Sequence, residues 1–287
     1  MAEHFVQPPQ WEWYILGYFF LAGLTGSLYA LATMLRLWGG PEDEATARAG
    51  FLIAFPVAIV CPVLLTLDLG TPLRFWHMLI ATTPGQGGLM FKYWSPMSVG
   101  SWALLVYGVF TFVSFVAELG AAGWGRSPAG RVFSGVGAAL GLFVASYTGV
   151  LLSVSNQPVW SDTWALGGLF LASGLTAAAA LLAVCAPRPR GNAATDGRLG
   201  RVDVYFALLE LMWIVLFFLG LNGAGTLSRL MGTPWLVLWL LVALGIAVPL
   251  VGGTGARRAA FVSMLAAAVV LAGTLALRAV VIFGAQV

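Results

Sequence analysis

The run WYILGYFFLAGLTGSLYALATMLR, Trp13 to Arg36, has no charged side chain before its last residue. A helix needs about 20 consecutive apolar residues to cross a bilayer, because its backbone polar groups must pair internally where there is no water. Seven further apolar runs of similar length follow, at residues 50–68, 96–119, 132–153, 163–185, 201–224, 233–251 and 259–283. The sequence therefore predicts an all-α integral membrane protein with eight transmembrane helices.

The composition excludes a water-soluble globular domain. Of the 287 residues, 60% are hydrophobic and only 9% are charged, whereas about a quarter of the residues are charged in soluble domains. The formal net charge of +3 requires no nucleic-acid partner. The opening residues, MAEHFVQPPQWEW, have acids and prolines where a signal peptide would carry lysine or arginine, so we expect the first helix to be retained.

The basic residues are distributed unevenly between the two sides that the alternating spans define. One side has ten of them: Arg36, Arg48, Arg126, Arg131, Arg188, Arg190, Arg198, Arg201, Arg257 and Arg258. The other side has four: Arg74, Lys92, Arg229 and Arg278. Because cytoplasmic loops carry the excess of lysine and arginine, both termini are expected on the non-cytoplasmic side.

The protein is expected to divide after its fourth helix. The segment FLAGLT at residues 20–25 resembles FLASGLT at residues 170–176, and both would run in the same direction, as in an internal repeat. We therefore expect one four-helix bundle over residues 1–158 and a second over residues 159–287, which includes a cytoplasmic loop at 186–200. In the fourth helix, Gly137 and Gly141 have the GxxxG spacing that allows a neighbouring helix to approach closely.

The stretch LDLGTPLRFWHML, Leu67 to Leu79, brings ionisable residues to the edge of a predicted span. Pro72 cannot continue a helix, so the second span should end there and a short interfacial helix should follow. A carboxylate such as Asp68 costs a few kcal/mol inside the hydrocarbon edge and often marks a functional pathway. Arg74 and His77 are interpreted either as lipid headgroup contacts or as ligand contacts.

The predicted outward loop after the fourth helix has aromatic and polar residues near the same membrane face. It reads SYTGVLLSVSNQPVWSDTW, Ser146 to Trp164. The phenol of Tyr147 lies inside the helix and needs a hydrogen-bond partner. Asn156 and Trp160 are expected at the mouth of the loop, where Trp160 would also serve as an aromatic-belt anchor.

A second set of buried polar residues is expected in the later helices: Glu210, Asn222 and Arg278. They are interpreted either as a structural tie that holds the second bundle together or as a proton path. The residues alone leave both interpretations open.

Several motifs in this order resemble the NrfD/PsrC family, whose members are quinone-reactive membrane subunits of polysulfide-reductase-type molybdoenzymes. The resemblance extends over essentially the whole sequence. It rests on FFLAGLTGS (19–27), LDLGTPLRFWHML (67–79), SPMSVGSWALLVYG (95–108), SYTGVLLSVSNQPVW (146–160), LFLASGLTAAAALL (169–182) and LALRAVVIFGAQ (275–286).

The resemblance implies two four-helix bundles, with a quinone site in the first bundle beside a docked iron–sulfur subunit. Asp68 and Tyr147 match the family's acid and its quinone-contacting tyrosine. The sequence departs from the pattern in its first helix, where Tyr18 stands in place of a histidine and Ile15 in place of an asparagine. The expected quinone contacts are Tyr18, Asp68, Arg74, His77, Tyr147, Asn156 and Trp160, with Asp68, Tyr147 and His77 taking part in the chemistry.

The function expected from the resemblance is that of a membrane anchor and quinone-reactive subunit in the bacterial cytoplasmic membrane. It would exchange electrons between menaquinone, favoured over ubiquinone, and a ferredoxin-like iron–sulfur subunit, with a molybdopterin-type catalytic subunit also on the non-cytoplasmic side. With two histidines, His4 and His77, and two cysteines, Cys61 and Cys185, the protein is expected to hold neither haem nor an iron–sulfur cluster. A secondary transporter and a passive membrane anchor are the alternatives.

Overall fold

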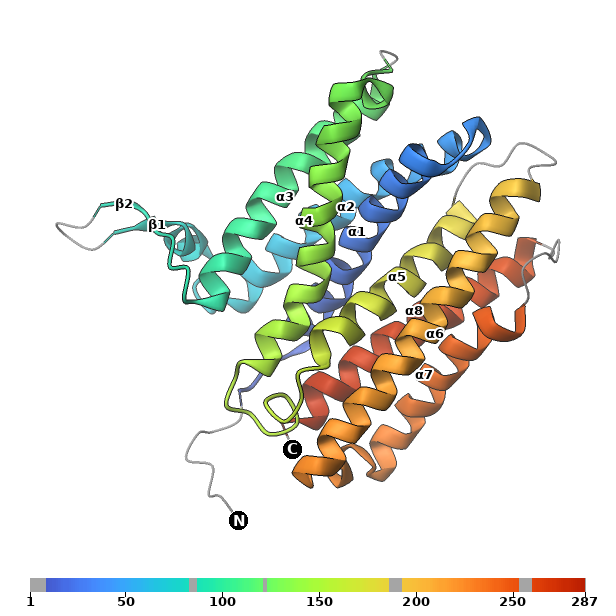
Figure 1. The fold of residues 1–287 in the computed structure, drawn as a ribbon. Coiled ribbons are helices and arrows are strands. Elements are labelled where there is room, and N and C mark those ends of the chain that lie inside the picture. The colour runs from blue at the N-terminus through green and yellow to red at the C-terminus, as the bar shows by residue number, and fades with distance from the viewer. Residues whose placement is uncertain (1–8, 83–86, 121–122, 186–192, 253–259, 287) are drawn as a thin grey trace.

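Helices make up most of the protein, and the computed structural model describes residues 9–82, 87–120, 123–185, 193–252 and 260–286 (Figure 1). The long helices are α1 (Trp13–Trp38), α2 (Glu44–Asp68), α3 (Pro96–Leu119), α4 (Pro128–Ser153), α5 (Leu166–Cys185), α6 (Ala193–Ala224), α7 (Thr233–Gly252) and α8 (Ala260–Gly284). All eight of these helices in the described part of the protein are long and apolar enough to cross a membrane. The predicted fold class is confirmed.

Short elements lie in the connections between the long helices. They are the 3-10 helices η1 (Pro41–Asp43), η2 (Pro72–Met78), η3 (Trp124–Arg126) and η4 (Leu227–Leu230), and the strands β1 (Ile80–Ala81) and β2 (Gly88–Leu89). The two strands pair antiparallel, with Ile80 opposite Leu89. The short helix predicted after Pro72 is present as η2. In Figure 1 the pair β1–β2 extends sideways from the end of the helices.

Two helices, α2 and α6, begin about two helical turns before their apolar runs. Helix α2 begins at Glu44 rather than at residue 50, and α6 begins at Ala193 rather than at residue 201. Hydropathy detects only the part of a helix that lies in hydrocarbon, whereas these first turns contain charged side chains. Arg198 in the first turns of α6 pairs with Glu42 at 3.0 Å and with Asp43. The predicted loop at 186–200 is therefore helical from residue 193, and residues 186–192 lie outside the described part.

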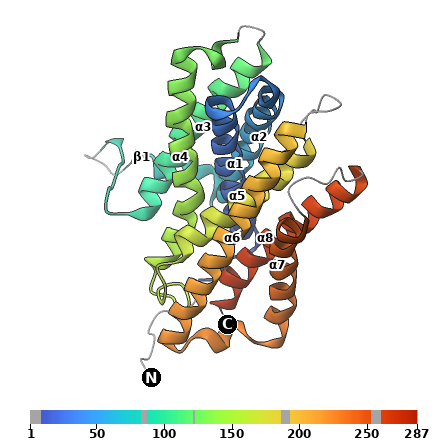
Figure 2. The same cartoon turned by 45° about the vertical axis from the view of Figure 1, so that its right-hand side comes forward.

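The helices form two rings of contacts. In the first ring α1 packs against α2, α2 against α3, α3 against α4 and α4 against α1. In the second ring α5, α6, α7 and α8 follow the same order. Helix α1 also packs against α5 and α8, so that it lies between the rings (Figure 2). The domain boundary at residue 158 stays a prediction, and so does the side of the membrane on which the termini lie.

Small residues allow the other helices to approach α1 closely. A Cβ atom on Gly26 would collide with the carbonyl group of Gly141 on α4, and a Cβ on Gly174 of α5 would lie 2.8 Å from the oxygen of Gly23. The close approach predicted for Gly141 is therefore present, and it is made with α1. The two similar segments that suggested a repeat meet each other at Gly23 and Gly174.

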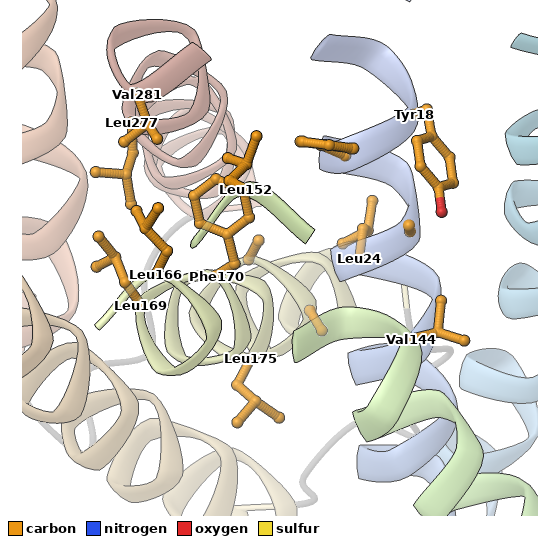
Figure 3. Close-up of a cluster of buried hydrophobic side chains, with 14 of the residues drawn as sticks. Tyr18, Leu24, Val144, Leu152, Leu166, Leu169, Phe170, Leu175, Leu277 and Val281 are labelled. Atoms are coloured by element: carbon orange, nitrogen blue, oxygen red, sulfur yellow. The ribbon is translucent and has the colours of Figure 1, made fainter. Parts of the chain in front are cut away.

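Apolar side chains fill the space where the two rings meet. Figure 3 shows Leu152, Leu166 and Phe170 of the α4–α5 region facing Val281 of α8. All four side chains are 0% exposed. Tyr18 projects from the other side of α1, away from this cluster (Figure 3). This cluster at the junction is therefore apolar, and Tyr18 is directed away from it.

The outward faces of the outer helices are apolar. Large exposed side chains include Val63 on α2, Phe112 on α3, Leu219 on α6 and Leu240 on α7. A soluble protein rarely exposes continuous apolar surface of this kind. These faces are the ones that the hydrocarbon of the membrane covers.

The contact at Gly26 yields a test of the packing of α1 against α4. Gly26→Ala should destabilise the protein by about 1–3 kcal/mol, because the added methyl group would meet backbone and force the helices apart. Thermal denaturation in detergent, followed by size-exclusion chromatography, measures the effect. Gly108→Ala in α3 is the matched control, since a Cβ there meets nothing within 4 Å, and it should leave stability unchanged or raise it slightly. Equal stabilities of the two variants would contradict this packing.

Candidate functional site

Two tyrosines from different helices are buried inside the first ring, close enough to interact electrostatically. Tyr18 of α1 is 4% exposed, and its hydroxyl group is within electrostatic range of the Tyr147 hydroxyl on α4 and the Cys61 thiol on α2. Tyr147 is also buried and donates a hydrogen bond of 2.6 Å to the carbonyl oxygen of Pro96, at the start of α3. All four helices of the first ring therefore meet at this pair of phenols.

The sequence positions these rings through a glycine and a proline. Pro96 begins α3, where its missing N–H costs nothing. Gly100, one turn later, leaves the space that the Tyr147 ring occupies, because a Cβ atom at Gly100 would overlap that ring. The Tyr147 hydroxyl is thereby fixed against Pro96. The Tyr18 hydroxyl has no hydrogen-bond partner among the described residues.

Asp68 lies at the end of α2, beyond the two phenols inside the first ring of helices. It is the last residue of α2, seven positions after Cys61, which corresponds to about 10 Å along a helix. Its side chain is partly exposed, and Glu12, just before α1, is within electrostatic range. No ion pair joins Asp68 to Arg74 in the part of the protein that the structure describes. Sequence reasoning missed Glu12, although an acid directly before the first span was a visible signal.

Arg74 and His77 lie on the 3-10 helix η2 rather than beside the phenols. Arg74 is exposed and His77 is half-buried. The imidazole ring contacts Trp76 edge to face, with 4.0 Å between the ring centroids. Leu73 is also exposed, so η2 presents a mixed basic and apolar surface at the same end of the molecule as Asp68. The other histidine, His4, lies outside the described residues.

Asn156 and Trp160 are separated from the two phenols. Asn156 is exposed. Trp160 is 1% exposed, stacks on Trp11 with 4.9 Å between ring centroids, and donates a hydrogen bond of 2.7 Å to the carbonyl oxygen of Val281. Val281 and Tyr18 lie on opposite sides of α1 in Figure 3. The structure therefore gives Trp160 a packing role between α1 and α8.

The expected second polar set is only partly brought together. Glu210 and Arg278 are both buried and within electrostatic range of each other, and Asp203 of α6 is also within range of Glu210. Asn222 is exposed at the end of α6 and does not join them. The alternation of the spans counts Arg278 among the basic residues of the non-cytoplasmic side. Its side chain is, however, 0% exposed inside the protein. Its position inside the protein could not be read from charge counts.

Arg278 ties the two rings together. Its Nε donates to the carbonyl oxygen of Phe19 on α1 at 3.1 Å, and its two terminal nitrogens donate to Ser173 Oγ at 2.9 Å and to the carbonyl oxygen of Phe170 at 3.0 Å on α5. The guanidinium also lies over the Phe170 ring, 4.9 Å from the centroid. Gly23 provides the space, since a Cβ there would crowd the guanidinium. These bonds favour the structural interpretation of Arg278.

Known proteins resemble this one along nearly its whole length. Residues 5–287 match the NrfD family described as polysulfide reductase. One of the chains of polysulfide reductase from Wolinella succinogenes is 30% identical over 311 residues, which span 96% of this protein and 94% of that relative. Protein NrfD of Escherichia coli is 26% identical, and the match spans 96% of this protein and 95% of the relative. One of the subunits of selenate reductase from Mesobacillus selenatarsenatis is 27% identical over 109 residues, 38% of this protein and 22% of the relative.

The structural tie at Arg278 can be tested by a change that keeps the charge. Arg278→Lys should lower stability by about 3–5 kcal/mol, because an ammonium group cannot reach the acceptors on both α1 and α5 and leaves buried carbonyl groups unpaired. Thermal unfolding in detergent measures the loss. Arg229→Lys, at an exposed position, is the control and should have no effect. A fully stable Arg278→Lys protein would show that the tie is dispensable.

Proposed function

Because this protein belongs to the NrfD family of polysulfide reductase membrane proteins, we propose that it is the quinone-reactive membrane subunit of a respiratory oxidoreductase complex. It exchanges electrons between the quinone pool and an iron–sulfur partner subunit. The observation that carries this proposal is the pair of buried phenols, Tyr18 and Tyr147, that interact electrostatically inside the first ring of helices.

The residues present at this pair fit a quinone. The Tyr18 hydroxyl makes no hydrogen bond within the described residues, so it is free to donate one to a ligand. A quinone carbonyl is an acceptor that would satisfy it. Leu64 of α2, which lies against Gly17 of α1, and the Tyr147 ring supply apolar walls. When bound, a menaquinone or ubiquinone supplies reversible transfer of two electrons and two protons.

Each residue of the site has a distinct task in this proposal. Tyr18 would donate a hydrogen bond that orients the ligand, and Tyr147, fixed by its bond to Pro96, would pack against the ligand from α4. Asp68 is the titratable group between these phenols and the end of α2, and it exchanges protons with the adjacent aqueous side. The two tyrosines would bind the ligand, and the Asp68 carboxylate would exchange the protons of the reaction.

The iron–sulfur partner docks at the end of the molecule that carries Asp68. There, η2 exposes Leu73, Phe75 and Trp76 beside Arg74. Exposed apolar clusters with a polar rim are typical of protein interaction sites. This end is the non-cytoplasmic side of the bacterial cytoplasmic membrane, where a catalytic partner of the molybdopterin type completes the assembly.

The proposed ligand contact is tested by removing a single hydroxyl group. Tyr18→Phe should weaken binding of a fluorescent menaquinol analogue up to about tenfold, because the hydrogen bond that is lost is worth about 0.5–1.5 kcal/mol. The measurement is fluorescence quenching during titration of the purified complex, with its partner subunits attached.

Tyr205→Phe is the matched control, because that phenol is 66% exposed on α6, and it should bind the analogue as the unchanged protein does. If the intact complex bound no analogue at all, the passive anchor and the transporter would replace the quinone-reactive subunit. If Tyr18→Phe bound as tightly as the control, the ligand would lie elsewhere.

A further inference from the structure

A cavity of about 790 Å³ lies at the end of the first ring of helices that is opposite Asp68. Residues from the end of α1, the start of α2, the end of α3, the end of α5 and the short helix η3 line it. The proposed quinone chemistry does not use this cavity. Because the transmembrane helices begin and end here, the cavity lies at the level where lipid headgroups replace acyl chains.

The two carboxylates at the cavity are paired from the inside of the protein. The side chain of Arg36 is 3% exposed, and its guanidinium pairs with Glu44 at 2.7 Å and with Glu118 at 2.5 Å. Gly125 leaves the space for this arrangement, because a Cβ atom there would lie 2.5 Å from a terminal nitrogen of Arg36. One buried cation therefore binds both acids, and their repulsion of an incoming anion is reduced.

Two further arginines keep their charge available at the cavity. Arg48 is exposed and donates a hydrogen bond of 2.8 Å to the backbone carbonyl oxygen of Glu118. Within the described ranges, no carboxylate lies within ion-pair distance of Arg48. The side chain of Arg126 is 68% exposed and lies 3.8 Å from Glu44. Three arginines against two glutamates leave one net positive charge, and the two exposed guanidinium groups have the planar set of donors that matches a phosphate.

An apolar wall adjoins these two arginines. Leu52 and Ile53 follow Arg48 by about one turn of α2, further into the membrane, and they line the same cavity. Leu119, at the end of α3, also lines it and is 62% exposed. A free inorganic anion would gain nothing from this wall. A phospholipid would place its phosphate at the arginines and an acyl chain along the apolar side chains.

The expected orientation supplies lipids of the matching charge. The count of basic residues assigns Arg36, Arg48 and Arg126 to the predicted cytoplasmic side. The cytoplasmic leaflet carries anionic lipids, and basic pockets between transmembrane helices on that side bind their headgroups. Charge complementarity therefore favours an anionic lipid over a zwitterionic one.

We propose that this cavity is a binding site for one anionic phospholipid. Arg48 and Arg126 bind its phosphate, and Leu52, Ile53 and Leu119 contact its acyl chains. The bound lipid would join α2, α3 and η3 at the end of the ring where the connections between the helices are short. This site does not depend on the quinone proposal, because it lies at the other end of α2.

A cysteine at the cavity provides a direct readout of its occupation. Cys185 lines the cavity and is exposed, whereas Cys61 is buried. The complex with its partner subunits is placed in nanodiscs of phosphatidylcholine that contain an increasing share of phosphatidylglycerol. A neutral, water-soluble maleimide then labels Cys185, and the labelling rate is measured on the band of this chain after electrophoresis. Cys185→Ser shows the background.

The labelling rate should fall as the share of phosphatidylglycerol rises, because the lipid covers the thiol. Arg48→Gln and Arg126→Gln should each require about fivefold more phosphatidylglycerol for the same protection, which is the effect of one basic side chain at an anionic surface. Arg48→Lys keeps the charge and should keep most of the protection. Arg131→Gln is the matched control, since Arg131 is exposed on α4 outside the cavity lining, and it should behave as the unchanged protein. Size-exclusion chromatography checks that each complex is intact.

Equal labelling rates with and without phosphatidylglycerol would overturn the lipid site. The same shift in Arg131→Gln as in Arg48→Gln would also overturn it, because a general surface potential would then explain the protection. Inorganic phosphate added to nanodiscs of phosphatidylcholine alone should leave the labelling rate unchanged. Protection by phosphate equal to that by phosphatidylglycerol would make the cavity a site for free anions and would contradict the proposal.

Discussion

Helix α1 is enclosed by protein on nearly every side, because it packs against α2, α4, α5 and α8. Most of its polar side chains therefore cannot reach water or lipid headgroups, and pairing with a neighbouring helix is required of most of them. That requirement determines what the surrounding helices present to α1. They supply glycines where backbones touch, hydroxyl groups opposite Thr25 and Tyr29, and one arginine for its carbonyl group at Phe19.

The two sides of α1 do different work. Toward α5 and α8 the contacts are apolar apart from Arg278, and they join the two rings of helices into one body. Trp160 and Trp11 reinforce this junction, and the side-chain oxygen of Gln286 accepts a hydrogen bond of 2.8 Å from the backbone of Trp11. Toward α2, α3 and α4 apolar contacts alternate with hydroxyl groups, and both phenols of the candidate site lie on this side. A rigid junction on one side thus fixes α1, and with it the position of Tyr18 relative to Tyr147.

The fold was largely readable from the sequence, because a membrane-spanning helix must be a long apolar run, and all eight runs are helices. The residues at which α2 and α6 begin could not be read from the sequence, since the first turns of these helices are charged and give no hydropathy signal. The site was readable only in part. Tyr18, Asp68 and Tyr147 could be proposed from the sequence, and their role stays a prediction. The hydrogen bonds of Tyr107 and Tyr29 could not be foreseen, because their partners lie on other helices. The sequence predicted Trp160 beside the ligand, whereas the structure packs it against Trp11 and Val281. A sequence pattern does not show which helix a loop side chain faces.

The central claim is that a quinone lies between Tyr18 and Tyr147. A photoreactive quinone analogue, cross-linked in the intact complex and located by mass spectrometry of the resulting peptides, tests it most directly. The account predicts labelled peptides from α1 and α4 near these two tyrosines, with protection by excess unlabelled quinone. Protectable labelling confined to α6, α7 or α8 would contradict it.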